Sequence, residues 1–247
     1  MPYIRKLPGL LAGGLLLLCQ GWPQVQAASL QVAPVNLSFA PGEAAQALRL
    51  SNSGTAPISA QIRIYDWRQQ DGRERLEPSQ TLAVSPPITQ IPPGKTQVVR
   101  VLRLDATAPA SEKALRLVVD ELPSPVLLGA KRQHDNEVNF LLRYSIPVFL
   151  APDAAVLDMT RVSAWVEHRQ GQASLHIDNQ NNTHLKLSRV ALVSAGGKET
   201  VVTDGLLGYV LPGQAMAWPL KKAGAATALR AHVNDSEAPQ TIPLRSQ

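Results

Sequence analysis

Cysteine is almost absent from this sequence, and its single copy is Cys19. That residue lies in an N-terminal stretch with the features of an export signal: two basic residues, an apolar run at 10–18 and a small-residue cleavage site that ends at Ala27. We expect cleavage after Ala27, so the mature chain, residues 28–247, has no cysteine and reaches an oxidising compartment without disulfides. Its stability must then come from the burial of apolar side chains.

Long apolar runs are also missing, and this absence argues against a membrane anchor. The run at 10–18 is too short to span a bilayer, and no later stretch is long and apolar enough to do so. A lipid anchor on Cys19 would require a small residue just before it, but that residue is Leu18. We therefore expect a soluble mature protein without stable membrane insertion.

Aromatic residues make up only 4% of the chain and charged residues 17%. The formal net charge of +5 is mild, and no Lys/Arg run is present, so nucleic acid is not an expected partner. An adhesin or carbohydrate-binding module would favour exposed aromatic residues. Here Trp67, Trp165 and Trp218 lie in strand-like runs that indicate burial. A binding module of this kind nevertheless stays the alternative interpretation.

No group of residues indicates catalysis. The chain has neither a G-x-S-x-G motif nor a phosphate-binding glycine loop, and its mature part has no cysteine nucleophile. The even gaps between His168, His176 and His184 are interrupted by turns and lack the short spacing of metal ligands. Asp120 and Glu121 are adjacent, so on a strand they point to opposite faces. We therefore predict no enzymatic activity, no metal and no cofactor.

Short apolar runs with an alternating pattern follow one another from residue 29 onward, separated by turns rich in Pro, Gly, Asn and Ser. Strands at intervals of about 8–12 residues with such turns are typical of β-sandwiches. No stretch indicates a helix. The expected strands are 30–32, 35–39, 47–50, 58–67, 81–84, 97–104, 115–122, 138–150, 162–166, 173–178, 185–193, 200–203, 209–211, 216–220 and 229–233.

A polar step with a proline at residues 151–153 interrupts this pattern and fits a linker between two domains. We predict a signal peptide at 1–27, a first domain at 28–151 and a second domain at 152–247. The second domain has about 95 residues, which is the size of one immunoglobulin-like sandwich. The predicted fold class is all-β, with two sandwich domains.

The stretch 138–150, VNFLLRYSIPVFL, predicts one long strand, because its alternate residues from Val138 to Val148 are all apolar or aromatic. Pro147 has no N–H to donate to a β-ladder, so at least one edge of this strand is unpaired there. A long apolar strand with a free edge tends to aggregate. The pattern alone leaves two interpretations open: an ordinary core strand, and an edge that is kept free for another chain.

Segments in both domains carry a family resemblance. They are residues 85–88, 92–101, 116–123 and 143–149 in the first domain and the turns at 182–183, 211–213 and 234–235 in the second. On these residues the chain resembles the periplasmic chaperones of the chaperone–usher pilus assembly pathway. Its Ser-Ile-Pro-Val-Phe segment at 145–149 is similar to the archaic or alternative branch of that family.

The resemblance implies two immunoglobulin-like domains in an L or boomerang arrangement and a non-enzymatic function in the periplasm. Chaperones of this family bind pilin subunits by donating a β-strand, called donor strand complementation, and deliver them to an outer-membrane usher. The strand at 138–150 matches the donated strand, so Val138, Phe140 and Leu142 are the side chains expected to fill the pilin groove. Self-association of the free protein stays open.

The resemblance also implies basic side chains that hold the C-terminal carboxylate of the subunit and fix the register of the added strand. The basic positions of the better-known branch fall on Asn36 and near Ser145 in this chain. We therefore expect Arg100, Arg143 or both to hold the carboxylate, and Arg103 is a weaker candidate. An ion pair unrelated to the subunit is the alternative for each.

The ion pair that joins the two domains in this family is incomplete here. Asp235 matches its acidic member, but the usual arginine position is Ala151. We expect the angle between the domains to be held differently in this chain.

Overall fold

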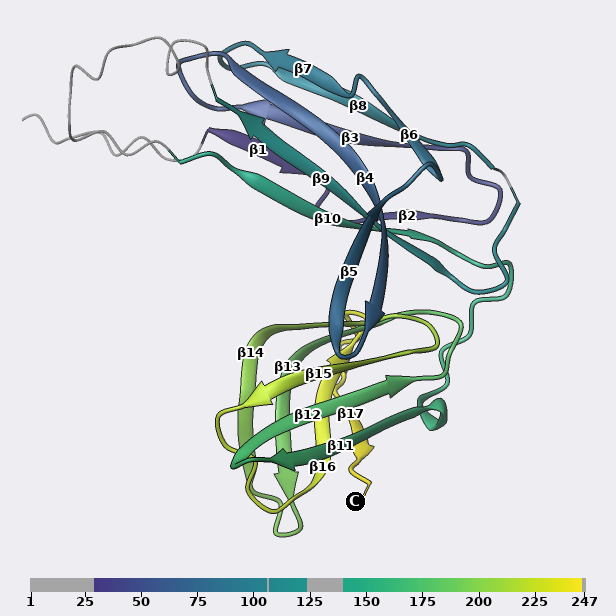
Figure 1. The fold of residues 1–247 in the computed structure, drawn as a ribbon, viewed down its shortest axis with the longest axis vertical. Coiled ribbons are helices and arrows are strands. Elements are labelled where there is room, and N and C mark those ends of the chain that lie inside the picture. The colour runs from purple at the N-terminus through teal and green to yellow at the C-terminus, as the bar shows by residue number, and fades with distance from the viewer. Residues whose placement is uncertain (1–28, 106, 124–139, 246–247) are drawn as a thin grey trace, which may run out of the picture.

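The computed structural model describes residues 29–105, 107–123 and 140–245. These residues are mostly β-strand, with one short 3-10 helix, η1 (Met159–Arg161), and the predicted all-β fold class is confirmed (Figure 1). Within these ranges no helix is long and apolar enough to cross a membrane. The strands are β1 (Leu30–Ala33), β2 (Leu37–Phe39), β3 (Ala45–Asn52), β4 (Ile58–Gln70), β5 (Arg73–Pro78), β6 (Leu82–Ser85), β7 (Ile88–Ile91), β8 (Thr96–Arg103), β9 (Lys113–Leu122), β10 (Arg143–Leu150), β11 (Val162–Arg169), β12 (Gln172–Asn179), β13 (Leu185–Ser194), β14 (Glu199–Val210), β15 (Gln214–Leu220), β16 (Ala226–Val233) and β17 (Gln240–Pro243).

The first domain is a sandwich of two sheets. One sheet has the strand order β1-β3-β8-β6, and the other has the order β2-β10-β9-β4-β5, with β7 also paired to β4. Every second residue of these strands points inward, as in Leu48 and Leu50 of β3 or Val99 and Val101 of β8. These side chains form one apolar core between the two sheets. The alternation seen in the sequence therefore marks the inner faces of the sandwich.

The second domain repeats this construction with two smaller sheets. Their strand orders are β11-β12-β15 and β14-β13-β16-β17. Buried leucines from both sheets, among them Leu175, Leu187 and Leu229, form a core that is separate from that of the first domain. Because each domain has its own core, the chain consists of two sandwiches, as the sequence predicted.

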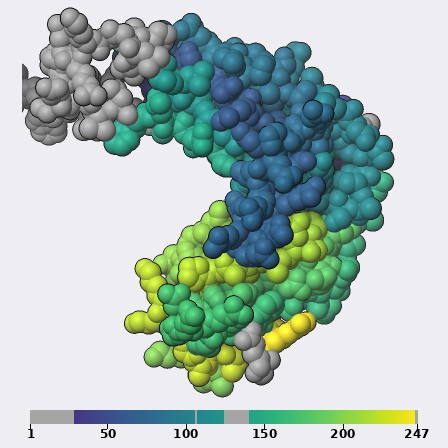
Figure 2. All heavy atoms as spheres, in the orientation of Figure 1, coloured from purple at the N-terminus to yellow at the C-terminus, as the bar shows by residue number. Residues whose placement is uncertain are grey.

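The two domains meet at the end of the first sandwich where β4, β9 and β10 approach the second. Trp67, Ala114 and Phe149 lie on these strands and pack with Leu211 and the partly buried Tyr209 of the second domain. The long β4–β5 hairpin, blue in Figure 1, reaches across to β15. Figure 2 shows the resulting bent shape, with a concave side between the two domains, so the predicted boomerang arrangement is confirmed.

Several strands differ from those predicted. Residues 200–203 and 209–211 were expected to be separate strands, but residues 199–210 form the single strand β14. The prediction missed β5, β7 and β17. All residues of β5 are exposed, so this strand carries no apolar alternation and pairs only as the outer half of a hairpin. An exposed edge strand of this kind leaves little trace in a hydrophobic pattern.

Candidate functional site

The most unusual feature of the first domain is the pairing of β10. On one side β10 is antiparallel to β9 along its whole length, from Arg143 opposite Asp120 to Leu150 opposite Lys113. On the other side it pairs with β2, in parallel, only at 148–150. Among the residues that the structure describes, 143–147 therefore have no strand on that side. The free edge that Pro147 predicted is present, and it covers more than half of the strand.

The side chains of β10 change from buried to exposed toward its N-terminal end. Ile146 and Val148 are buried in the core, and Tyr144 is partly buried, with its hydroxyl donating to the carbonyl oxygen of Leu30 at 2.6 Å. Leu142 packs against the same core from its margin, whereas Phe140 is 81% exposed. The alternating apolar residues predicted from the sequence therefore extend beyond the core to which Ile146 and Val148 belong. Val138 lies outside the described residues.

The strand begins at Arg143, whereas the sequence predicted a start at Val138. Its partner β9 ends at Leu122, and the last backbone hydrogen bond of this pair is donated by Glu121 N to Leu142 O at 2.9 Å. In this register Leu142 and Leu141 still lie opposite Glu121 and Leu122 of β9. The backbone N–H of Leu142, however, donates to the side-chain carboxylate of Glu121 at 3.2 Å and not to its backbone carbonyl, so the ladder ends at Arg143.

A charged cluster lies beside the start of this edge, on the face of the sheet that is away from the core. Asp120 accepts hydrogen bonds from Arg143 Nε and from Arg63 on β4, and the three side chains line a shallow hollow together with Leu141 and Leu142. Burial raises the pKa of Asp120, but the hydrogen bonds from the two guanidinium groups outweigh this effect and lower the pKa overall. Glu121 lines the same hollow, so two basic side chains lie beside two acidic ones, and the exposed guanidinium of Arg143 is the group that can accept a further anionic partner.

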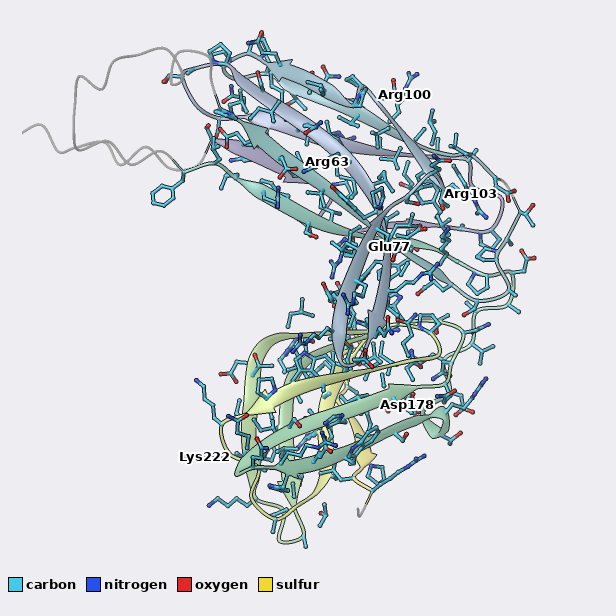
Figure 3. All side chains as sticks on the ribbon, in the orientation of Figure 1. Arg63, Glu77, Arg100, Arg103, Asp178 and Lys222 are labelled. Carbon is cyan, nitrogen blue, oxygen red and sulfur yellow. The ribbon has the colours of Figure 1, made fainter. Side chains whose placement is uncertain are left out.

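The structure separates the two arginines that the sequence grouped as carboxylate anchors. Arg143 lies on β10 itself, and its side chain is 67% exposed. Arg100 lies on β8 in the other sheet, and Figure 3 shows it on the side of the first domain that faces away from the second. Arg103, also on β8, donates to the carbonyl oxygens of Asp105 and Thr107. Only Arg143 of these three lies in the sheet that contains the free edge.

Sequence reasoning missed two basic side chains near this edge, Arg63 and Arg116. Arg116 lies directly opposite Pro147 in the β9–β10 pair. Its guanidinium carbon lies 3.6 Å from the centroid of the Trp67 ring, and its Nη2 lies 3.1 Å from Glu74 Oε1. The sequence signal that could have identified Arg116 is the alternation along β9, because a two-residue step places Arg116, Val118 and Asp120 on one face.

Asp235 forms its ion pair within the second domain, with Lys186 Nζ at 2.7 Å. Its predicted role between the domains is not supported by a contact of this side chain in the described ranges, and it stays a prediction. His176 and His184 each lie beside a glutamate, Glu167 and Glu112 respectively. No group of three or more His, Asp or Glu side chains that could hold a metal occurs in the part of the chain described here.

The chain matches the family described as "Pili and flagellar-assembly chaperone, PapD N-terminal domain" over residues 29–156. This match covers more than half of the chain, so the protein belongs to that family of pilus-assembly chaperones. The resemblance seen in the sequence is confirmed. No curated protein sequence matches the chain. The family model ends at 156, which is close to the predicted domain boundary at 151, and the exact boundary stays a prediction.

Solved structures of similar chaperones support the same two-domain fold. A chain of the CsuC–CsuE chaperone–tip adhesion subunit complex from the archaic Csu pili of Acinetobacter baumannii is 22% identical, with a TM-score of 0.66 over 88% of this chain and 98% of that chain. The Pseudomonas aeruginosa CupB2 chaperone is 21% identical, with a TM-score of 0.54 over 85% of this chain and 97% of that one. A chain of the Salmonella enterica SafA pilin–SafB chaperone complex is 16% identical, with a TM-score of 0.63 over 87% and 96%.

These comparisons define the class of the protein. The two sandwiches are immunoglobulin-like domains, arranged as in pilus-assembly chaperones. A family of assembly chaperones is not a family of enzymes, so the chain is not an enzyme.

Proposed function

We propose that this protein is a periplasmic chaperone that binds pilin subunits by donor strand complementation and delivers them to an outer-membrane usher. The proposal includes export by cleavage after Ala27 and membership of the archaic or alternative branch. The observation that carries it is the free edge of β10 at 143–147, continued by the exposed Phe140 and the half-buried Leu142.

Strand addition requires two features, and both meet on β10. The backbone groups of 143–147 have no strand on one side in the described part of the chain, so they can form a ladder with an incoming strand. The alternate residues before this segment are apolar, and of the described ones Phe140 is exposed and Leu142 lies only at the margin of the core, so both are accessible to a groove in the partner. Burial of Val138, Phe140 and Leu142 would contribute about 1.5–3 kcal/mol each before the cost of ordering the segment.

The charged cluster supports a role for Arg143 in holding the carboxylate of a subunit's C-terminus. Its guanidinium is anchored on Asp120 through Nε, which leaves its two terminal nitrogens free for a second carboxylate. The position at the start of the free edge would fix the register of the added strand. Arg100 is the less favoured anchor because it lies in the other sheet.

The test is the capture of a pilin subunit. The tagged protein is co-expressed in the periplasm with a small exported subunit encoded beside it, in the absence of an usher, and the complex is recovered through the tag. We expect a stable complex with the unaltered chain and its loss in Val138→Asp/Phe140→Asp/Leu142→Asp, because charged side chains cannot enter an apolar groove.

A matched control places the same charge elsewhere on the first domain. Val98 of β8 is 46% exposed on the other sheet, so Val98→Asp should leave capture unchanged. Circular dichroism confirms that each variant is folded. Equal capture by the folded triple variant would refute strand donation by these residues, and failure of the unaltered chain to capture any subunit would refute the chaperone function itself.

A further inference from the structure

The register of β4 and β9 identifies a row of side chains at the junction of the two domains. On the face away from the core, Tyr65 lies opposite Arg116. Two residues further along each strand, Trp67 and Ala114 belong to the interdomain cluster. A further two-residue step reaches Gln69 on β4 and Glu112 just before β9. A period of two keeps all of these side chains on one face, so Gln69 and Glu112 are directed at the second domain.

Gln69 binds the backbone of the second domain with both ends of its side-chain amide. Its Nε2 donates to the carbonyl oxygen of Tyr209 at 2.8 Å, and its Oε1 accepts from the N–H of Leu211 at 2.8 Å. The backbone N–H of Gln69 donates to the side-chain oxygen of Gln214. Only 6% of Gln69 is exposed, so these bonds are formed away from water, where a lost partner is costly.

Glu112 makes a second polar connection. Its Oε1 accepts from the backbone N–H of His184 at 3.0 Å and lies 2.7 Å from Nδ1 of the same residue. Its own N–H donates to the carbonyl oxygen of Asn182 at 2.9 Å. The ring of His184 stacks on Phe149, with centroids 3.8 Å apart and the planes 7° from parallel. Glu112 therefore ties His184 to the last turn of chain before β9, beside the end of β10.

We propose that Gln69 and Glu112 are positioning residues that fix the angle between the two domains. The apolar cluster of Trp67, Phe149 and Leu211 provides adhesion without a preferred direction, because apolar contacts are not directional. Hydrogen bonds to backbone groups depend on angle as well as distance, so such bonds from two separate segments, β4 and the residue before β9, define one orientation. These hydrogen bonds take the place of an interdomain ion pair through Asp235. The proposed role of Gln69 and Glu112 does not depend on strand donation.

The test measures the distance between the domains in the purified mature chain. Because Cys19 lies in the predicted signal peptide, the mature chain has no cysteine, and two can be introduced for fluorescent dyes. Ala47→Cys on β3 and Lys222→Cys beyond β15 place one dye on an exposed position of each domain. Single-molecule energy transfer then reports the distribution of interdomain distances.

The double variant Gln69→Ala/Glu112→Ala loses the side-chain bonds to Tyr209, Leu211 and His184 and keeps only those donated by the backbone N–H groups of residues 69 and 112. It should widen this distribution about twofold with unchanged circular dichroism, because a small interface with fewer directional bonds permits relative motion of domains. Glu112→Gln keeps an oxygen that accepts both bonds from His184, so it should remain as narrow as the unaltered chain. Asp235→Asn removes an ion pair that lies within the second domain and should also remain narrow.

Two results would overturn the proposal. One is a folded double variant whose distribution is as narrow as that of the unaltered chain. The other is a distribution in Asp235→Asn as wide as that of the double variant, which would show that Asp235 fixes the angle between the domains. If the double variant does not fold, the single variants Gln69→Ala and Glu112→Ala decide the question: widening in either supports the proposal, and narrow distributions in both reject it.

Discussion

Gly72 and Ala217 touch where the β4–β5 hairpin reaches the second domain. A Cβ atom placed on Gly72 would lie 3.0 Å from the Cβ of Ala217, which is closer than two such atoms normally approach. Gly72 also has a φ of +69°, a conformation that residues other than glycine rarely adopt. Gly72 is therefore both a turn residue of the β4–β5 hairpin and the point at which the hairpin contacts β15.

Gly72→Ala should destabilise the protein through both effects. The left-handed backbone alone costs about 1–2 kcal/mol, and the contact with Ala217 should add about 1 kcal/mol or more. The measurement is the free energy of unfolding from urea denaturation. Gly94→Ala is the matched control, because Gly94 has a φ of +67° and no atom within 4 Å of the added Cβ. Equal losses in the two variants would show that the hairpin tip does not press on the second domain.

Asp120 should give the stability of the first domain a pH dependence in acid. Burial opposes its ionisation, but the hydrogen bonds from Arg143 and Arg63 lower its pKa in the folded state. Its contribution is therefore fully present above the unfolded pKa of about 3.9 and is lost as the pH falls through the lower folded pKa. We expect Asp120→Asn to cost about 1–2 kcal/mol at neutral pH, because both guanidinium groups are partly exposed.

The check on Asp120 is urea denaturation of the unaltered chain and Asp120→Asn between pH 7 and strongly acidic pH. The difference in unfolding free energy should be constant near neutrality and shrink toward zero in acid. Asp204→Asn, at an exposed position of β14, should show no such difference. A difference for Asp120→Asn that persists unchanged at the lowest pH would mean that the carboxylate charge is not its source.

Arg116 should not be replaceable by lysine without loss. Its planar guanidinium lies over Trp67, and lysine has no plane to stack on the indole ring. We expect Arg116→Lys to lower the free energy of unfolding by about 1–2 kcal/mol. Chemical denaturation followed by tryptophan fluorescence provides the measurement. Arg75→Lys, on the exposed strand β5, should be neutral, and a neutral Arg116→Lys would argue against a stabilising stack.

The core of each domain could be predicted from the sequence because it depends on local alternation. The inward side chains of β3, β4, β8 and β9 are those that the period of two marks, and proline and glycine mark the turns between them. The strands that were missed or misplaced are those without such a signal. β5 is exposed throughout. The described residues 140–142 of the expected strand at 138–150 lie outside β10, because the N–H of Leu142 donates to the Glu121 carboxylate and not to a backbone carbonyl.

The candidate site could be predicted only in part. The alternating apolar residues before β10 and the free edge at Pro147 could be predicted from the sequence, since both are properties of one segment. The association of Arg63, Asp120 and Arg143 was not, because these residues come from three strands and meet only through the pairing register. The same holds for Gln69 and Glu112, which no local pattern distinguishes from other polar residues.

The sequence by itself determined the all-β class, the two sandwiches and the segment that forms the free edge, because periodicity and turn residues act over a few positions. Tertiary structure alone decided which charged residues meet, where β10 begins and how the domains are joined. These features depend on which strands become neighbours and on the register in which they pair. That choice is made by the packing of whole sheets, in which residues far apart in the chain become adjacent.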